Sequence, residues 1–167
     1  MARQIDHESP VLLGVSFGGI MCIEIARQIP TKVVIIISSI KNFHEMPYWM
    51  RLAGKMRLNK IFPMRSFKLI EPLENYNLGV ESASEKKLVS DYRRNVNQQY
   101  SDWAINTILH WRNEWLPQRL FHIHGVKDRI FPIKKVQADI IIPNAGHLMV
   151  MNRSAPVNAA INKILSV

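Results

Sequence analysis

The chain of 167 residues contains a single cysteine, Cys22, so no disulfide can form within it. It also lacks a long apolar run. The longest, Val33–Ile37, has five residues, whereas a helix needs roughly 20 to cross a bilayer. The first eight residues mix charged and polar side chains where a secretory signal would carry an apolar segment. These absences predict a cytoplasmic protein with no transmembrane segment.

Acidic residues are few: 13 Asp and Glu stand against 22 Lys and Arg, which gives a formal net charge of +9. The excess is concentrated between Lys41 and Lys68, where seven basic residues accompany one acidic residue, Glu45. A solvated helical face accounts for this segment, and attraction to an anionic substrate or a membrane surface is the alternative. No nucleic-acid recognition motif accompanies the charge, so nucleic acid is not an expected partner.

Glycine is also scarce, and three of the seven glycines fall between positions 14 and 19. Residues 11–20 read VLLGVSFGGI, which predicts a buried strand over 11–15, a tight turn at Ser16 and a helix from Phe17. Small residues two positions before and after the serine, Gly14 and Gly18, would let strand and helix approach closely. This arrangement is typical of a nucleophile elbow.

The remaining pattern predicts an α/β protein. A continuous β-branched run at Val33–Ile37 is typical of a parallel strand covered on both faces. Strands are expected again over 119–124 and 138–142, with a last helix over 155–165. Between them, residues 41–117 show no comparable run and predict a helical insertion, with candidate helices over 47–58, 85–97 and 101–114. Residues 1–40 and 118–167 would form the core.

A serine hydroxyl needs a base, and the base needs an orienting carboxylate. Asp128 follows one of the later predicted strands and His147 follows the next, so both would lie at the same sheet edge as Ser16. Asp139 is a poorer candidate for the acid because it falls inside a strand. The pair His122 and His124 suggests a metal site, but the triad already uses Asp128 and His147, so no metal is predicted.

The elbow, the stretch HGVKDRIFP at 124–132 and Gly146-His147 together resemble the α/β-hydrolase superfamily over almost the whole chain. The resemblance implies Ser16 as nucleophile, His147 as base, Asp128 as acid and the backbone N–H of Phe17 as an oxyanion donor. It implies no cofactor. The insertion resembles the family's lid, and we expect its apolar side chains to line a substrate pocket, with Met46, Trp49, Trp103 and Trp111 as candidates.

The family normally has four strands before the elbow, and a loop after the third supplies a second oxyanion donor. Neither precedes Ser16 here, and loss of one donor costs about 2.7 to 4 kcal/mol in the transition state. Strand 11–15 would also expose an apolar edge. Three explanations remain open: a fragment or mis-started reading frame, an edge that pairs with a partner chain or second copy, and a reduced hydrolase.

These observations predict an α/β-hydrolase-type parallel sheet that lacks the usual first four strands and carries a helical lid insertion. The expected activity is hydrolysis of a carboxylic ester or thioester through a Ser-His-Asp triad and an acyl-enzyme. The alternative is a truncated or non-catalytic binding or assembly module.

Overall fold

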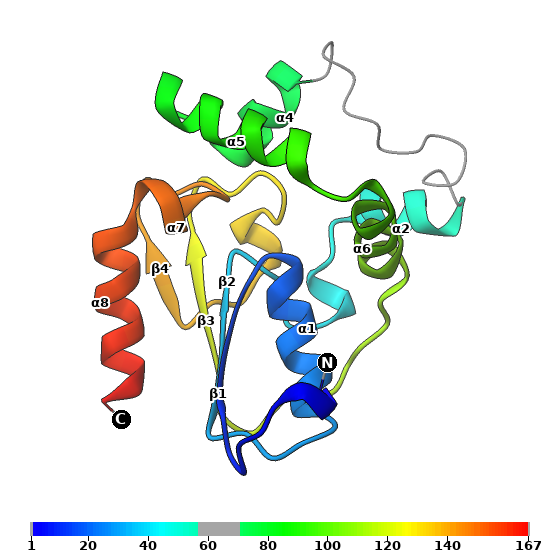
Figure 1. Cartoon of the computed structure of the whole chain (residues 1–167), viewed down its shortest axis with the longest axis vertical. Helices are drawn as coiled ribbons and strands as arrows, with labels where there is room; N and C mark the ends of the chain where they lie inside the picture. The colour runs from blue at the N-terminus through cyan, green and yellow to red at the C-terminus, as the bar shows by residue number, and fades with distance from the viewer. Residues whose placement is uncertain (1, 57–70, 167) are drawn as a thin grey trace.

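A computed structural model describes residues 2–56 and 71–166 and contains a parallel four-stranded sheet with helices on both faces (Figure 1). The strands lie side by side in the order of the sequence: β1 (Val11–Val15), β2 (Val33–Ile37), β3 (Leu120–Gly125) and β4 (Ile140–Ile142). All three strand pairs are parallel, so the carboxyl ends of the four strands meet at one edge. The sheet confirms the predicted fold class.

Helices cover both faces of the sheet. The described helices are α1 (Phe17–Ala26), α2 (Tyr48–Lys55), α4 (Glu71–Leu78), α5 (Ala83–Asn95), α6 (Gln98–His110), α7 (Met149–Asn152) and α8 (Ser154–Leu165). Short 3-10 turns occupy Ala2–Gln4, Phe43–Glu45 and Ile133–Lys135. Figure 1 shows α4 and α5 above the carboxyl ends of the strands.

The β-branched run of β2 separates two apolar clusters. Val34 and Ile36 pack with α1 on one face, whereas Val33, Ile35 and Ile37 pack with α8 on the other. All five side chains are buried, which is the reason that this strand is continuously apolar instead of alternating. Cys22 of α1 is also buried, and burial raises the pKa of its thiol to about 11.

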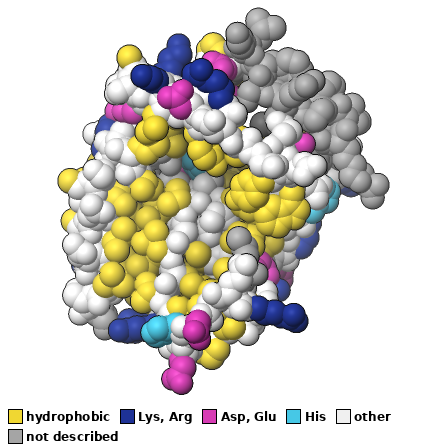
Figure 2. All heavy atoms as spheres, in the orientation of Figure 1, with side chains coloured by type: hydrophobic (Ala, Val, Ile, Leu, Met, Phe, Trp, Pro, Cys, Tyr) yellow, Lys and Arg dark blue, Asp and Glu magenta, His cyan; other side chains and the backbone are white. Residues whose placement is uncertain are grey.

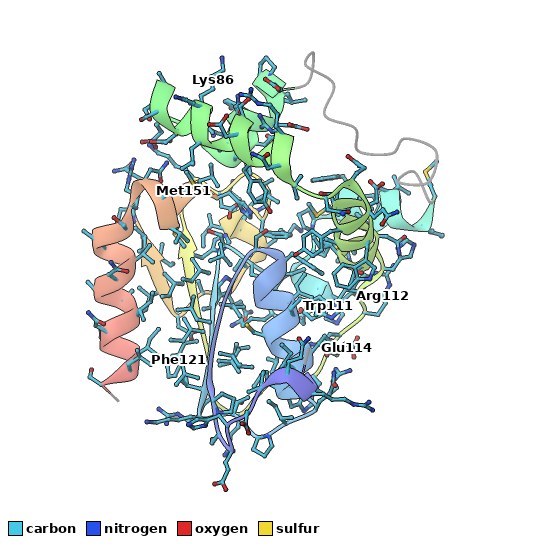
Figure 3. All side chains as sticks on the ribbon, in the orientation of Figure 1. Lys86, Trp111, Arg112, Glu114, Phe121 and Met151 are labelled. Carbon is cyan, nitrogen blue, oxygen red and sulfur yellow. The ribbon has the colours of Figure 1, made fainter. Side chains whose placement is uncertain are left out.

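Strand β1 lies at the edge of the described sheet, with α1 on one of its faces only. Its other face presents Val11, Leu13 and Val15, which are 43%, 46% and 37% exposed. Figure 2 shows a hydrophobic surface between β1 and α8, and Figure 3 places Phe121 in that region. The described structure therefore has the exposed apolar edge that the sequence predicts.

Several predicted element boundaries differ from the structure, and two short helices were not predicted. The first helix, predicted to run from Phe17 to about Ile29, ends at Ala26, because residues 27–29 form a turn before Pro30, whose ring disfavours helix at the preceding residue. The helix expected over 101–114 is α6, which begins earlier and ends at His110. Helices α4 and α7 were not predicted, since each is short and lacks a clear apolar period.

Part of the basic segment lies outside the described residues. Arg57, Lys60, Arg65 and Lys68 belong to it, as does Leu58, the predicted end of the helix seen as α2. In the described part of this segment, the Arg51 guanidinium lies 5.3 Å from the ring centroid of Phe43. Over 2–56 and 71–166, no helix is long and apolar enough to cross a membrane.

Candidate active site

Ser16 occupies the turn between β1 and α1 in a strained conformation. Its φ of 53° and ψ of −120° place a residue with a side chain in a region that normally favours glycine. Two hydrogen bonds from neighbouring segments hold this backbone: Ser16 N–H donates to the carbonyl of Ile37 (2.9 Å), and Ser39 Oγ donates to the carbonyl of Ser16 (2.7 Å). The turn places Ser16 directly after the carboxyl end of β1.

The glycines around Ser16 differ in what they allow. A Cβ on Gly14 would lie 2.2 Å from the carbonyl oxygen of Gly18, so strand and helix approach each other only because Gly14 has no side chain. A Cβ on Gly18 would meet no described atom within 4 Å, contrary to the expectation that both flanking glycines are sterically required. Gly19 has the second close contact instead, at 2.6 Å from Ser39 Oγ.

Ser16, His147 and Asp128 form a continuous hydrogen-bonded chain. Ser16 Oγ lies 2.9 Å from His147 Nε2, and His147 Nδ1 lies 2.8 Å from Asp128 Oδ2. The three residues come from the ends of β1, β4 and β3, which the parallel sheet brings to one edge. A carboxylate on Nδ1 keeps the proton there and leaves Nε2 free to accept the serine proton.

The Asp128 carboxylate is fixed by its own loop. Its Oδ1 accepts hydrogen bonds from the backbone N–H groups of Ile130 and Phe131, both at 2.9 Å, and the residue is only 3% exposed. Asp139 is used elsewhere: its Oδ2 accepts from the backbone N–H of His122 at 2.7 Å, just before β4. Asp128 is thus the carboxylate that meets His147.

His122 and His124 lie behind Asp128 as a fully buried pair. His124 Nε2 donates to the carbonyl of Phe131 (2.8 Å), since a carbonyl can only accept, and His124 Nδ1 then accepts from His122 Nε2 (3.1 Å). Burial lowers the pKa of His122 to about 3 and also lowers the pKa of His124. Both rings are therefore neutral near pH 7.

This pairing leaves little capacity for a metal ion. Three of the four ring nitrogens of the pair are engaged in the two hydrogen bonds just described. The fourth, His122 Nδ1, is buried and has no hydrogen-bond partner among the described residues. Within 2–56 and 71–166, no group of three His, Cys, Asp or Glu side chains is arranged to hold a metal ion.

A cavity of about 590 Å³ opens beside Ser16 and His147. Apart from these two residues its lining is almost wholly apolar and comes from the end of β1, from α4 and α5, and from the segment that follows His147. The other lining residues are Val15, Leu78, Leu88, Val89, Tyr92, Leu148, Val150 and Met151. A concave, largely apolar site with a few convergent polar groups is the usual form of a small-molecule pocket.

None of the four side chains predicted for the pocket lines this cavity. Met46 and Trp111 are buried in the cluster that packs on α1. The backbone is extended at Trp111, directly after α6, and the Trp111 indole N–H donates to Glu24 Oε1 (2.7 Å). Trp49 is 59% exposed. Trp103 lies with its ring centroid 5.3 Å from that of Phe17, at the start of α1. Met46 and Trp111 thus pack the helices onto the core, and Figure 3 places Trp111 between α6 and α1.

The sequence does contain a signal for the cavity residues. Leu88, Val89 and Tyr92 recur at the spacing of one helix face, on α5. Leu148, Val150 and Met151 directly follow His147. The aromatic and methionine residues of the insertion were a stronger signal, but large apolar side chains are more often packed in a core than left to line a site.

Phe17 is the first residue of α1, and the first N–H groups of a helix have no intrahelical acceptor. Its N–H therefore belongs to the positive end of a ten-residue helix, next to Ser16. This is the position at which a developing oxyanion on a group attached to Ser16 Oγ would be stabilised.

No protein-family model matches the chain, and no curated protein matches its sequence. Solved structures do. A meta-cleavage product hydrolase from Pseudomonas fluorescens has a TM-score of 0.65 at 14% identity over 95% of this chain. A bromoperoxidase from Bacillus anthracis has a TM-score of 0.68 at 12% identity over 99%, and an α/β hydrolase from a deep-sea metagenome has 0.60 at 14% over 99%.

The chain spans 65% of the length of the first of these structures, 70% of the second and 68% of the third. At these identities the likeness concerns the fold. The observed strand order, the turn at Ser16 and the helices that follow β1, β2 and β4 agree with it. The chain has the α/β-hydrolase fold, from the strand before the serine turn to the final helix.

Proposed function

We propose that the chain is a serine hydrolase of carboxylic esters or thioesters. The observation that carries the proposal is the 2.9 Å contact between Ser16 Oγ and His147 Nε2, made by a histidine whose other nitrogen lies 2.8 Å from Asp128. A base that holds the serine hydroxyl at hydrogen-bond distance, with its tautomer set by a carboxylate, is what nucleophilic activation requires.

In the proposed first step, Ser16 Oγ attacks the acyl carbonyl while His147 Nε2 accepts the hydroxyl proton. The carbonyl oxygen takes up the negative charge and receives the N–H of Phe17. The tetrahedral intermediate then expels the alcohol or thiol, which takes the proton from His147, and the acyl group remains on Ser16. Water then releases the acyl group. His147 accepts a proton from the water, the hydroxide oxygen bonds to the acyl carbon, and the bond to Ser16 Oγ breaks as this oxygen takes the proton back from His147, so that the carboxylic acid leaves.

Burial supports these roles. His147 is 5% exposed and Asp128 is 3% exposed, so the imidazolium formed during attack would face the carboxylate with little water between them. In such surroundings the attraction between the two charges is stronger than in bulk water. The hydrogen bonds to Asp128 from the backbone of its loop mean that little reorganisation is needed when the charge appears.

Turnover of matched p-nitrophenyl butyrate and butyryl thioester substrates tests the proposal. We expect Ser16→Ala and His147→Gln each to reduce kcat by about 10⁶-fold, since the two residues act as one unit. Thr107→Ala, on the exposed part of α6, is the control and should leave turnover unchanged. Equal turnover in the wild type and Ser16→Ala would refute the proposal.

A second candidate is a non-catalytic assembly module that buries β1 against another chain. It is favoured by the exposed row Val11, Leu13 and Val15 on a strand that, among the described residues, pairs with β2 alone. An open apolar edge is a template for strand addition. Light scattering tests it: we expect Leu13→Lys to convert a dimer or complex to a monomer, and a wild-type monomer that binds no partner would contradict it.

A further inference from the structure

The cavity beside Ser16 lies between α5 on one side and the segment that follows His147, which includes α7, on the other. Leu88, Val89 and Tyr92 come from a single face of α5, and Val150 and Met151 come from the α7 region opposite. Figure 3 places Met151 on α7, on the side of α5 that faces the sheet, whereas Lys86 lies on the outer side of α5. The apolar face of α5 is thus turned toward the serine.

Many of these apolar side chains are only half covered by protein. Leu88 is 57% exposed, Tyr92 65%, Val150 37% and Met151 39%, and Val15 at the floor is 37% exposed. Figure 2 shows hydrophobic side chains gathered here, below the charged side chains of α5. A contiguous exposed apolar patch around a polar pair is typical of a ligand-binding groove.

Polar contacts fix the wall formed by α4 and α5 relative to α7. Leu148 N–H donates to the carbonyl of Leu78 (3.1 Å), and Asn152 Nδ2 donates to the carbonyl of Gly79 (3.2 Å). Arg153 bonds both carboxylate oxygens of Glu81, at 2.9 and 2.8 Å. The two sides of the cavity are held together before any ligand binds, which lowers the cost of ordering them.

The charged groups near the cavity are directed at one another instead of into it. Glu81 is paired with Arg153, and Glu85 accepts from Asn152 Nδ2 at 3.3 Å. No Asp, Glu, Lys or Arg side chain of the described residues lines the cavity. The lining offers no partner for a charged or strongly polar ligand, and burial of such a group without a partner is unfavourable.

We propose that this cavity is the acyl site, and that it selects an uncharged alkyl chain whose carbonyl carbon lies at Ser16. The proposal rests on the proposed hydrolase function for the position of the ester, but the binding of the chain itself does not require catalysis. Each methylene that leaves water should strengthen binding about fourfold until the cavity is filled.

The test uses Ser16→Ala, which retains the cavity and cannot form an acyl-enzyme. Calorimetry would compare the p-nitrophenyl esters of acetic, butyric, hexanoic and octanoic acid with the monoester of octanedioic acid. We expect Kd to fall about fourfold per methylene along the neutral series, and the terminal carboxylate to abolish the gain. A Kd that is independent of chain length, or equal for octanoic and octanedioic esters, would overturn the proposal.

Two substitutions in the same background locate the site. Leu88→Glu puts a charge in the cavity and should flatten the dependence on chain length, with Met151→Glu as a second variant from the opposite wall. The matched control is Leu73→Glu, on an exposed leucine of α4 that does not line the cavity, and it should keep the dependence. If Leu73→Glu and Leu88→Glu behave alike, the cavity is not the site.

The outcomes separate this proposal from the proposed function. If the wild type hydrolyses none of these esters while Ser16→Ala binds them with the expected dependence on length, the acyl site stands and the hydrolase assignment fails. If the wild type hydrolyses them with a kcat/KM that does not vary with chain length, the hydrolase assignment stands and the acyl site is refuted.

Discussion

Acid should destabilise the fold through His122, the buried histidine behind the candidate active site. Its ring is fully buried, it donates to His124, and its other nitrogen has no partner among the described residues. Burial is the main cause that lowers its pKa to about 3 from an ordinary value of 6.5, with the neighbouring His124 as a second cause. The folded protein therefore keeps this ring neutral at a pH where the unfolded chain protonates it.

The sign and size of the effect follow from this difference. Above about pH 6.5 neither state binds the proton, so the histidine does not affect stability. Below this pH the unfolded chain binds a proton on His122 that the folded protein does not bind. The free energy of unfolding therefore falls until the pH reaches about 3, the pKa of His122 in the folded protein. Between about pH 7.5 and pH 5.5 the loss due to this one ring is about 1.4 kcal/mol.

Urea denaturation at the two pH values would measure it in the wild type and in His122→Leu. We expect the decrease in the free energy of unfolding to be smaller by about 1.4 kcal/mol in the variant. Glu45, whose pKa burial raises so that acid favours the fold, titrates in both proteins and cancels in the comparison.

His110→Leu is the control, because that ring is already exposed at the end of α6. It should leave the pH dependence as in the wild type. The reasoning is refuted if His122→Leu and the wild type lose the same free energy of unfolding between the two pH values.

Three further outcomes follow from the geometry around Ser16. Gly14→Ala should lower the free energy of unfolding by more than about 2 kcal/mol, because its Cβ would overlap the carbonyl of Gly18. Gly18→Ala should be neutral or stabilising by up to about 1 kcal/mol, and urea denaturation of both variants tests the difference. Asp128→Asn should reduce kcat by about 10⁴-fold if the hydrolase proposal holds, because His147 then takes the wrong tautomer; circular dichroism would check that the fold is retained. Cys22 should resist a thiol reagent at pH 8 until urea unfolds the chain, and rapid modification of the folded protein would contradict its burial.

The sequence predicted best where one physical requirement determined the residue. Val33–Ile37 is continuously apolar because both faces of β2 are covered, and this run was predicted to be a parallel strand. The strained turn at Ser16 was predicted because such a turn requires a small residue at Gly14. The hydrogen bonds that join it to His147 and Asp128 agree with the predicted order and strand ends.

Prediction failed where several environments suit the same side chain. Trp111 and Met46 are equally suitable for a pocket and a core, and only the fold shows that they pack against α1. The cavity is lined by α5 and α7 because tertiary contacts such as Asn152 to Gly79 bring these distant segments together. Such long-range contacts leave little trace in local periodicity.

The central claim is that the Ser16 hydroxyl is an activated nucleophile. Phosphonylation by a fluorophosphonate tests this most directly, because it requires the serine and its base and does not require turnover. Peptide mass spectrometry of the reacted full chain should locate a single adduct at Ser16, which is lost in Ser16→Ala and strongly slowed in His147→Gln. An unmodified Ser16, or an adduct that forms equally fast without His147, would contradict the account.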